Sequence, residues 1–210
     1  MVASGVHIAL HCLASRHRIA ADRPSPLPSV LRREIVWSVC SSCSIVTLID
    51  MLLDSMDQSS GMAEGGLLES GWGKLMFTLL FLVLWGDTHF YWTHRLLHAV
   101  PFLYRRVHSV HHQSRNPNAF SGLCFHPIES LVYFSQLGIF ALCPGLCAWR
   151  TLFKWGTILM PVTTHHGFDD SFLGGHSTFH HAHHVRVVGN FGGLHPLWDR
   201  VAGTLLPEGK

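Results

Sequence analysis

Charged side chains are scarce in this sequence. Only 13% of its 210 residues are Asp, Glu, Lys or Arg, whereas 48% are hydrophobic. Since a soluble domain usually carries about 25% charged residues, the deficit predicts a chain that is either embedded in lipid or unusually buried. The net charge is only +2 and the basic residues are scattered, which argues against a nucleic-acid partner.

Two familiar metal motifs are also missing or incomplete. The sequence has no H-E-x-x-H, which excludes the metalloproteases that use it. Cys40 and Cys43 form a C-x-x-C, but no second pair lies nearby and the surrounding residues are apolar. We therefore expect the six cysteines to be free thiols of a lipid-buried or cytosol-facing protein.

Histidine, by contrast, is abundant. Of the 18 histidines, six lie between His89 and His112 and eight lie between His165 and His195. Neutral imidazole is the commonest metal ligand among side chains. Two histidine-rich blocks separated by apolar sequence therefore predict one metal site assembled from both.

The apolar residues form four stretches, at 35–53, 75–86, 127–147 and 151–164. Asp50 and several serines weaken the first, and the second is expected to continue as a helix through Asp87 towards His98. Because the fourth is short for a straight span, we expect an all-α integral membrane bundle with either about four spans or two helical hairpins. Residues 1–34 form an N-terminal segment to which we assign no function.

The arginines predict an orientation in the membrane. Five precede the first apolar stretch and four follow the second within residues 95–115, whereas residues 54–73 contain acids but no Lys or Arg. By the positive-inside rule, the N-terminus and both histidine blocks face the cytosol. Arg150 and Lys154 do not fit this pattern. The expected location is the endoplasmic reticulum or a bacterial-type inner membrane.

The first histidine motif is H-R-L-L-H, in which His94 and His98 share one helical face. Asp87, seven residues before His94, falls on the same face. We therefore interpret the two histidines as metal ligands and Asp87 as a carboxylate that orients one of their imidazoles. His89 points to roughly the opposite side and is expected to be a packing or interfacial residue.

Two further motifs share the spacing H-x-x-H-H, which again puts three side chains on one helical face. Their members are His108, His111 and His112, and His180, His183 and His184. His181 is rotated by about 100° from His180 and is not expected to be a ligand. Eight imidazoles exceed what one ion binds, so two ions are implied. Iron, copper, zinc and nickel all suit nitrogen-rich ligation.

The order of these motifs resembles the fatty acid hydroxylase/sterol desaturase superfamily, over about residues 31–206. The resemblance extends to D-T-H-F-Y-W-T-H-R-L-L-H at 87–98, H-P-I-E-S at 126–130, T-H-H-G-F at 164–168 and L-W-D-R-V-A-G-T at 197–204. Around its third histidine motif, the chain looks closer to the sterol desaturase-like branch than to the fatty acid 2-hydroxylases. We assign the family domain to residues 35–206.

The resemblance implies a cytosolic, histidine-rich helical cap that holds two iron ions. Dioxygen would be the co-substrate, and electrons would come from NAD(P)H through a b-type cytochrome or a similar carrier. The reaction would be hydroxylation or desaturation of a sterol or fatty acyl lipid in lipid biosynthesis. By position, His165 is the candidate ninth ligand, and His126 is a ligand or the partner of one. His176 could share the face of His180, although Gly174, Gly175 and Ser177 favour a helix that begins near Ser177.

Two alternatives to an active enzyme are a different class of protein and an inactive homologue. A non-enzymatic histidine-rich protein could store or transport metal, but transporters place ionisable ligands inside their spans. Here the histidine motifs lie outside the apolar stretches, which disfavours that function. An inactive homologue is the other alternative, although all three motifs are intact.

Overall fold

The computed structural model describes residues 27–60, 71–114, 118, 120–168 and 176–207, and all regular elements among them are helices. One long rod comprises α2 (Pro28–Trp37), a π-helical segment (Ser38–Cys43) and α3 (Ser44–Ser60), and a second is α4 (Gly71–Ala99). Pro28–Asp57 and Gly71–Ala99 are long and apolar enough to cross a membrane. These rods contain the first two predicted spans.

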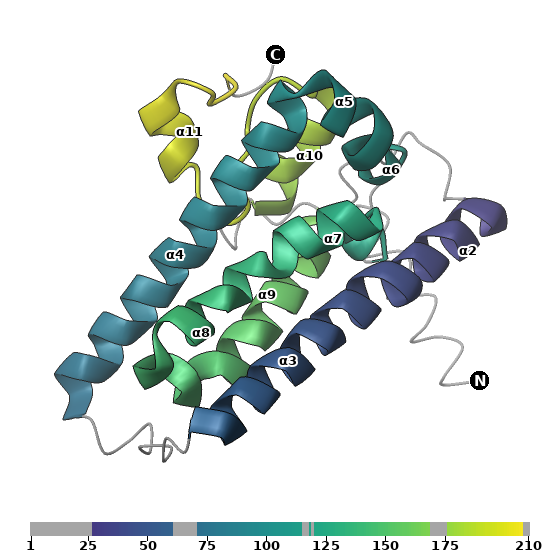
Figure 1. Ribbon diagram of the computed structural model, residues 1–210. Helices are drawn as coiled ribbons and strands as arrows, with labels where there is room; N and C mark the ends of the chain where they lie inside the picture. Colours follow the sequence, from purple (N-terminus) through teal and green to yellow (C-terminus); the bar gives the residue numbers. More distant parts are fainter. Residues whose placement is uncertain (1–26, 61–70, 115–117, 119, 169–175, 208–210) are drawn as a thin grey trace, which may run out of the picture.

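The other two apolar stretches form shorter helices between the rods (Figure 1). The third consists of α7 (Pro127–Phe134), a 3-10 turn (Ser135–Gly138) and α8 (Ile139–Leu142). After a second 3-10 segment (Pro144–Trp149), α9 (Arg150–Thr164) completes the hairpin. With 15 residues, α9 extends for about 22 Å, less than the 30 Å or so of a hydrocarbon core. Within the described residues, therefore, two helices rather than four meet the length of a span.

The polar residues that weaken the first rod have partners on the short hairpin. Ser41 Oγ lies 2.7 Å from Ser130 Oγ on α7, and the Ser42 hydroxyl donates to the backbone oxygen of Leu123 at 2.7 Å. At the other end of the rod, Asp50 pairs with Lys154 and Arg150 on α9. Because a buried polar group is costly unless it is paired, these contacts fix the register of the rod against the hairpin. They also neutralise Arg150 and Lys154, the two cations that do not fit the arginine pattern.

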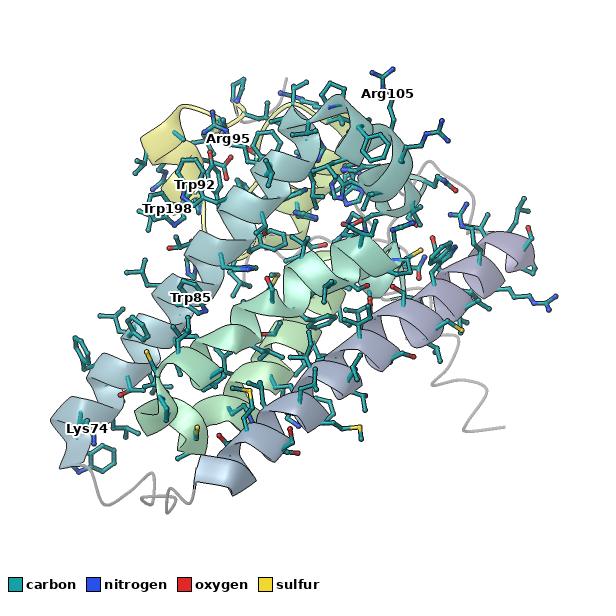
Figure 2. All side chains as sticks on the ribbon, viewed as in Figure 1. Lys74, Trp85, Trp92, Arg95, Arg105 and Trp198 are labelled. Carbon is teal, nitrogen blue, oxygen red and sulfur yellow. The ribbon has the colours of Figure 1, made fainter. Side chains whose placement is uncertain are left out.

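All the remaining short helices gather at one end of the bundle (Figure 1). They are α5 (Pro101–Leu103), a π-helical turn (Tyr104–His108), α6 (Ser109–His112), a 3-10 turn (Ser121–Leu123), α10 (His176–Arg186) and α11 (Leu197–Ala202). Figure 2 places Lys74 near the opposite end of α4, and Trp92, Arg95 and Trp198 near the gathered helices. Lys74 and Trp92 are about 27 Å apart along the helix axis, close to the thickness of a hydrocarbon core. The gathered helices would then lie at one membrane surface.

This arrangement yields a topology prediction. Reporter tags inserted at residue 60 and residue 205 should be accessible from opposite sides of the membrane, because residue 60 ends α3 at the far end of the bundle and residue 205 follows α11. Protection of each tag in sealed vesicles measures this directly. Accessibility of both tags from the same side would contradict the two-rod arrangement.

Candidate metal centre

Nine histidines converge at the gathered end of the bundle and form two groups. Within each group the ligand nitrogens all lie within 4.8 Å of one another. The five-histidine group consists of His94, His98, His108, His112 and His183, and the four-histidine group consists of His111, His165, His180 and His184. The structure thus brings together the eight histidines of the three motifs and His165.

Each H-x-x-H-H triplet contributes to both groups. On α6 and the turn before it, His108 and His112 belong to the five-histidine group and His111 to the other. On α10 the division is reversed, since His183 joins the five-histidine group while His180 and His184 join the other. The two triplets therefore lie across both groups and hold them side by side.

The Nε2 atoms face one another at short distances. His112 Nε2 lies 3.1, 3.0 and 3.2 Å from the Nε2 atoms of His98, His108 and His183. In the second group, His165 Nε2 lies 3.2 and 3.0 Å from those of His111 and His184. One proton on an imidazole cannot satisfy several such neighbours. Ligands about 2.1 Å from one ion and at right angles would be about 3.0 Å apart, so this spacing fits a shared metal.

Four imidazoles are oriented through their other nitrogen. His94 Nδ1 lies 2.8 Å from Phe191 O, His183 Nδ1 lies 2.7 Å from Gly189 O, and His165 Nδ1 lies 2.7 Å from Pro161 O. Carbonyl oxygens only accept, so each Nδ1 carries the proton and donates it. The lone pair is then on Nε2, which faces the group.

The fourth imidazole is oriented by a carboxylate. His108 Nδ1 lies 2.6 Å from Glu129 Oε1, and both side chains are buried. The second carboxylate oxygen of Glu129 has no hydrogen-bond partner among the described residues. A buried carboxylate beside a neutral imidazole lacks a compensating charge, which a cation bound through His108 would supply.

The loop that supplies two of these carbonyls is itself held by Asp199. Asp199 is fully buried on α11, and its carboxylate accepts hydrogen bonds from the backbone N–H groups of Phe191 and Gly192. At Gly189 the backbone packs so closely that an added Cβ would lie 2.5 Å from Thr204 O. The position of α11 thereby fixes the carbonyls that orient His94 and His183.

The electrostatics of the groups also fit a metal. Burial, reinforced by the neighbouring imidazoles, lowers the pKa of His111, His180 and His184 well below the ordinary value. These rings are therefore neutral at physiological pH and can donate lone pairs. The Nε2 atoms of His94 and His180 are buried and have no hydrogen-bond partner among the described residues. Metal coordination would satisfy these orphaned atoms.

Asp87 and His126 lie outside both groups. Asp87 accepts a hydrogen bond from the backbone N–H of His195, and no described contact joins it to a grouped imidazole. His126 caps α7, where its Nδ1 accepts from Ile128 N–H, and its ring stacks on Trp37. His176 is the first residue of α10, close to the predicted start, and its side chain lies outside the described residues.

The two predicted bystanders are also separate from the groups. His89 Nε2 lies 3.0 Å from the hydroxyl of Ser135, which agrees with a packing role. His181 is half-buried on α10 and belongs to neither group.

A helical bundle with two apolar rods and two imidazole groups defines a class of histidine-rich proteins suited to binding metal at a membrane. The chain belongs to the fatty acid hydroxylase family, whose model matches residues 79–204. That range contains all nine grouped histidines.

Several curated relatives are named as sterol enzymes. The chain is 30% identical to the lathosterol oxidase of Mus musculus, over 86% of this chain and 63% of the relative. It is 34% identical to a putative methylsterol monooxygenase of Dictyostelium discoideum, over 62% of this chain and 51% of the relative. For a Delta(7)-sterol 5(6)-desaturase of Gibberella zeae the identity is 27%, over 84% and 58%.

These relatives confirm the predicted sterol desaturase-like branch. The chain spans between about half and two thirds of their length. No solved structure shows significant similarity to the chain.

Alanine variants in α10 should separate ligands from neighbours. His180→Ala, His183→Ala and His184→Ala each remove a grouped imidazole nitrogen and should lower bound metal, whereas His181→Ala should leave it close to the unmodified level. Elemental analysis at matched expression measures the difference. A His181 variant as metal-poor as the His183 variant would show that the ligand set is wrong.

Glu129→Gln should weaken metal binding by about 10- to 100-fold, the usual cost of losing a charged partner of a liganding histidine. The amide can still accept the His108 proton, so the tautomer is retained while the charge is lost. Chelator competition measures the affinity. Glu34→Gln is the matched control, because Glu34 is equally buried but bonds Ser114 and Asn118. Equal losses in both variants would point to general destabilisation.

Proposed function

We propose that this chain is an iron-dependent oxidoreductase that uses dioxygen to hydroxylate or desaturate a membrane lipid of the sterol class. The observation that carries the proposal is an apolar cavity of about 340 Å³, which shares Phe90, Tyr133 and Met160 with a smaller cavity lined by grouped histidines. This volume lies within the range of small-molecule binding sites. A protein that only stored or transported metal would have no need of such a cavity.

The cavity extends from the outer surface of the bundle towards the histidine groups. It lies between α4 and α9, and its lining includes Val83 and Leu152, which are 51% and 58% exposed on the outer surface of the bundle. At its other end, Phe90, Tyr133 and Met160 also line the small cavity that contacts the histidines. A lipid could therefore enter sideways from the membrane and approach the centre without crossing water.

The residues that line both cavities are suited to positioning a lipid and excluding water. The Tyr133 hydroxyl donates to Thr157 O at 2.7 Å, which fixes its ring between α7 and α9. Phe90 packs against Tyr133 with ring centroids 5.9 Å apart and against His94 at 5.1 Å. Met160, with its flexible thioether, completes an apolar boundary that can adapt to a bound chain or ring.

The nine grouped histidines would hold two iron ions, five imidazoles at one and four at the other. Bound iron would supply the oxidation of an unactivated C–H bond, which amino-acid side chains do not perform. The protein holds the imidazoles neutral and correctly oriented through Glu129 and the carbonyls of residues 161, 189 and 191. We propose that NAD(P)H supplies electrons through a b-type cytochrome or a similar carrier at the cytosolic surface.

The sterol class is inferred from the three relatives described above, which are named as a lathosterol oxidase, a putative methylsterol monooxygenase and a sterol desaturase. Hydroxylation and desaturation share the initial attack on a C–H bond, so both outcomes fit the same centre. The intact histidine set favours an active enzyme over an inactive homologue.

Metal content and lipid products test this function together. Protein purified after iron-replete expression should contain two iron ions per chain, one for each histidine group. Cells that express it should accumulate an oxidised sterol that is absent from cells expressing His183→Ala. Elemental analysis and mass spectrometry of sterol extracts measure these outcomes. One ion per chain, or unchanged sterols with two irons bound, would overturn the proposal.

A further inference from the structure

The lipid cavity has an uneven distribution of polarity. Along α4 its lining residues are Leu79, Leu82, Val83, Gly86, Asp87 and Phe90. These positions recur every three or four residues, so one face of the helix follows the cavity for about 16 Å. The stretch far from the metal centre is apolar, and the acidic side chain lies one helical turn before Phe90.

Asp87 is the cavity's acidic group and retains unused acceptor capacity. Two other polar side chains of the lining are engaged, since the Thr157 hydroxyl on α9 donates to Phe153 O and the Gln136 amide, in the 3-10 turn after α7, donates to Tyr133 O. Asp87 receives the backbone N–H of His195, but a carboxylate has about four acceptor positions. His195 lines the cavity beside it.

The spacing along α4 relates this carboxylate to the metal centre. Asp87 precedes Phe90 by about 4.5 Å and His94 by about 10 Å along the helix axis, and it follows Leu79 by about 12 Å. A lipid whose polar group lay at Asp87 would have its apolar body along Leu79 and Leu82. Only atoms within a few bonds of the polar group would approach the histidines.

We propose that Asp87, together with His195, binds a hydroxyl group of the lipid and so selects substrates whose oxidised carbon lies close to that hydroxyl. This inference rests on the proposed function. A hydroxyl is the simplest donor that a sterol-class lipid presents, and its hydrogen bond to a carboxylate is of the stronger, charge-assisted kind. The carboxylate therefore acts as a positioning group for the lipid rather than as the partner of an imidazole.

Equilibrium binding of two lipids to the metal-loaded full chain in lipid nanodiscs tests the inference. The probes are a radiolabelled sterol with a free hydroxyl and its methyl ether, which lacks the donor. The unmodified protein should bind the ether about 10- to 100-fold more weakly, the usual effect of losing a hydrogen bond to a charged group. Asp87→Leu should bind both lipids about equally, at the level of the ether, and Asp87→Asn should fall between.

Gly156→Leu is the matched control. Gly156 lines the apolar part of the cavity, and nothing lies within 4 Å of an added Cβ. A leucine there should fill the cavity and weaken the binding of both lipids by the same factor, so the ratio of the two affinities should not change. Metal content should be unchanged in all variants.

The outcomes separate the inference from the proposed function. Equal binding of both lipids by the unmodified protein would overturn the role of Asp87 while leaving the cavity as the lipid site. If Asp87→Asn lost metal and bound both lipids more weakly by the same factor, Asp87 would only support the loop at 191–195. Failure to bind either lipid, or no effect of Gly156→Leu, would overturn the proposed lipid site and the inference with it.

Discussion

The structure depends on holding nine neutral imidazoles together, eight of them buried, with a nitrogen of each facing its group. Such a cluster has no stability of its own, because each ring loses hydration and gains no partner for its lone pair. The protein meets this constraint from outside. Glu129 and the carbonyls of Pro161, Gly189 and Phe191 bind the outer nitrogens, and Asp199 holds the loop that carries two of them. The rest of the cap is arranged around these contacts.

Contacts between the first rod and the short hairpin, away from the centre, also help to orient the imidazoles. Glu129 reaches His108 because the hydroxyls of Ser41 and Ser42 on the first rod bond Ser130 on α7. In the same way, Pro161 presents its carbonyl because α9 is anchored at its other end by the ion pairs with Asp50. Residues that make the first rod a poor span in isolation therefore stabilise the scaffold of the centre.

Much of the site could be predicted because helical geometry is local. The spacing of His94 and His98, and of each H-x-x-H-H triplet, was sufficient to choose the side chains that converge. Sequence could not reveal how each triplet divides between the groups, since that depends on the angles between α4, α6 and α10. The spacing of side chains does not show which backbone carbonyls contact an imidazole, so the roles of Gly189 and Phe191 were not predicted. Asp87 was predicted to orient an imidazole, but its hydrogen-bond partner is the backbone N–H of His195, which comes from a distant loop that a helical pattern does not place.

The division of the triplets between the groups has a consequence for how metal is acquired. His111 and His112 are adjacent in the chain, yet they belong to different groups, as do His183 and His184. An ion held by one group would restrain α6 and α10 in the arrangement that the other group requires. The ordering cost would then be met largely by the first ion, so the second would bind more tightly. Loading would be positively cooperative, and chains carrying a single ion would be a minor species during maturation.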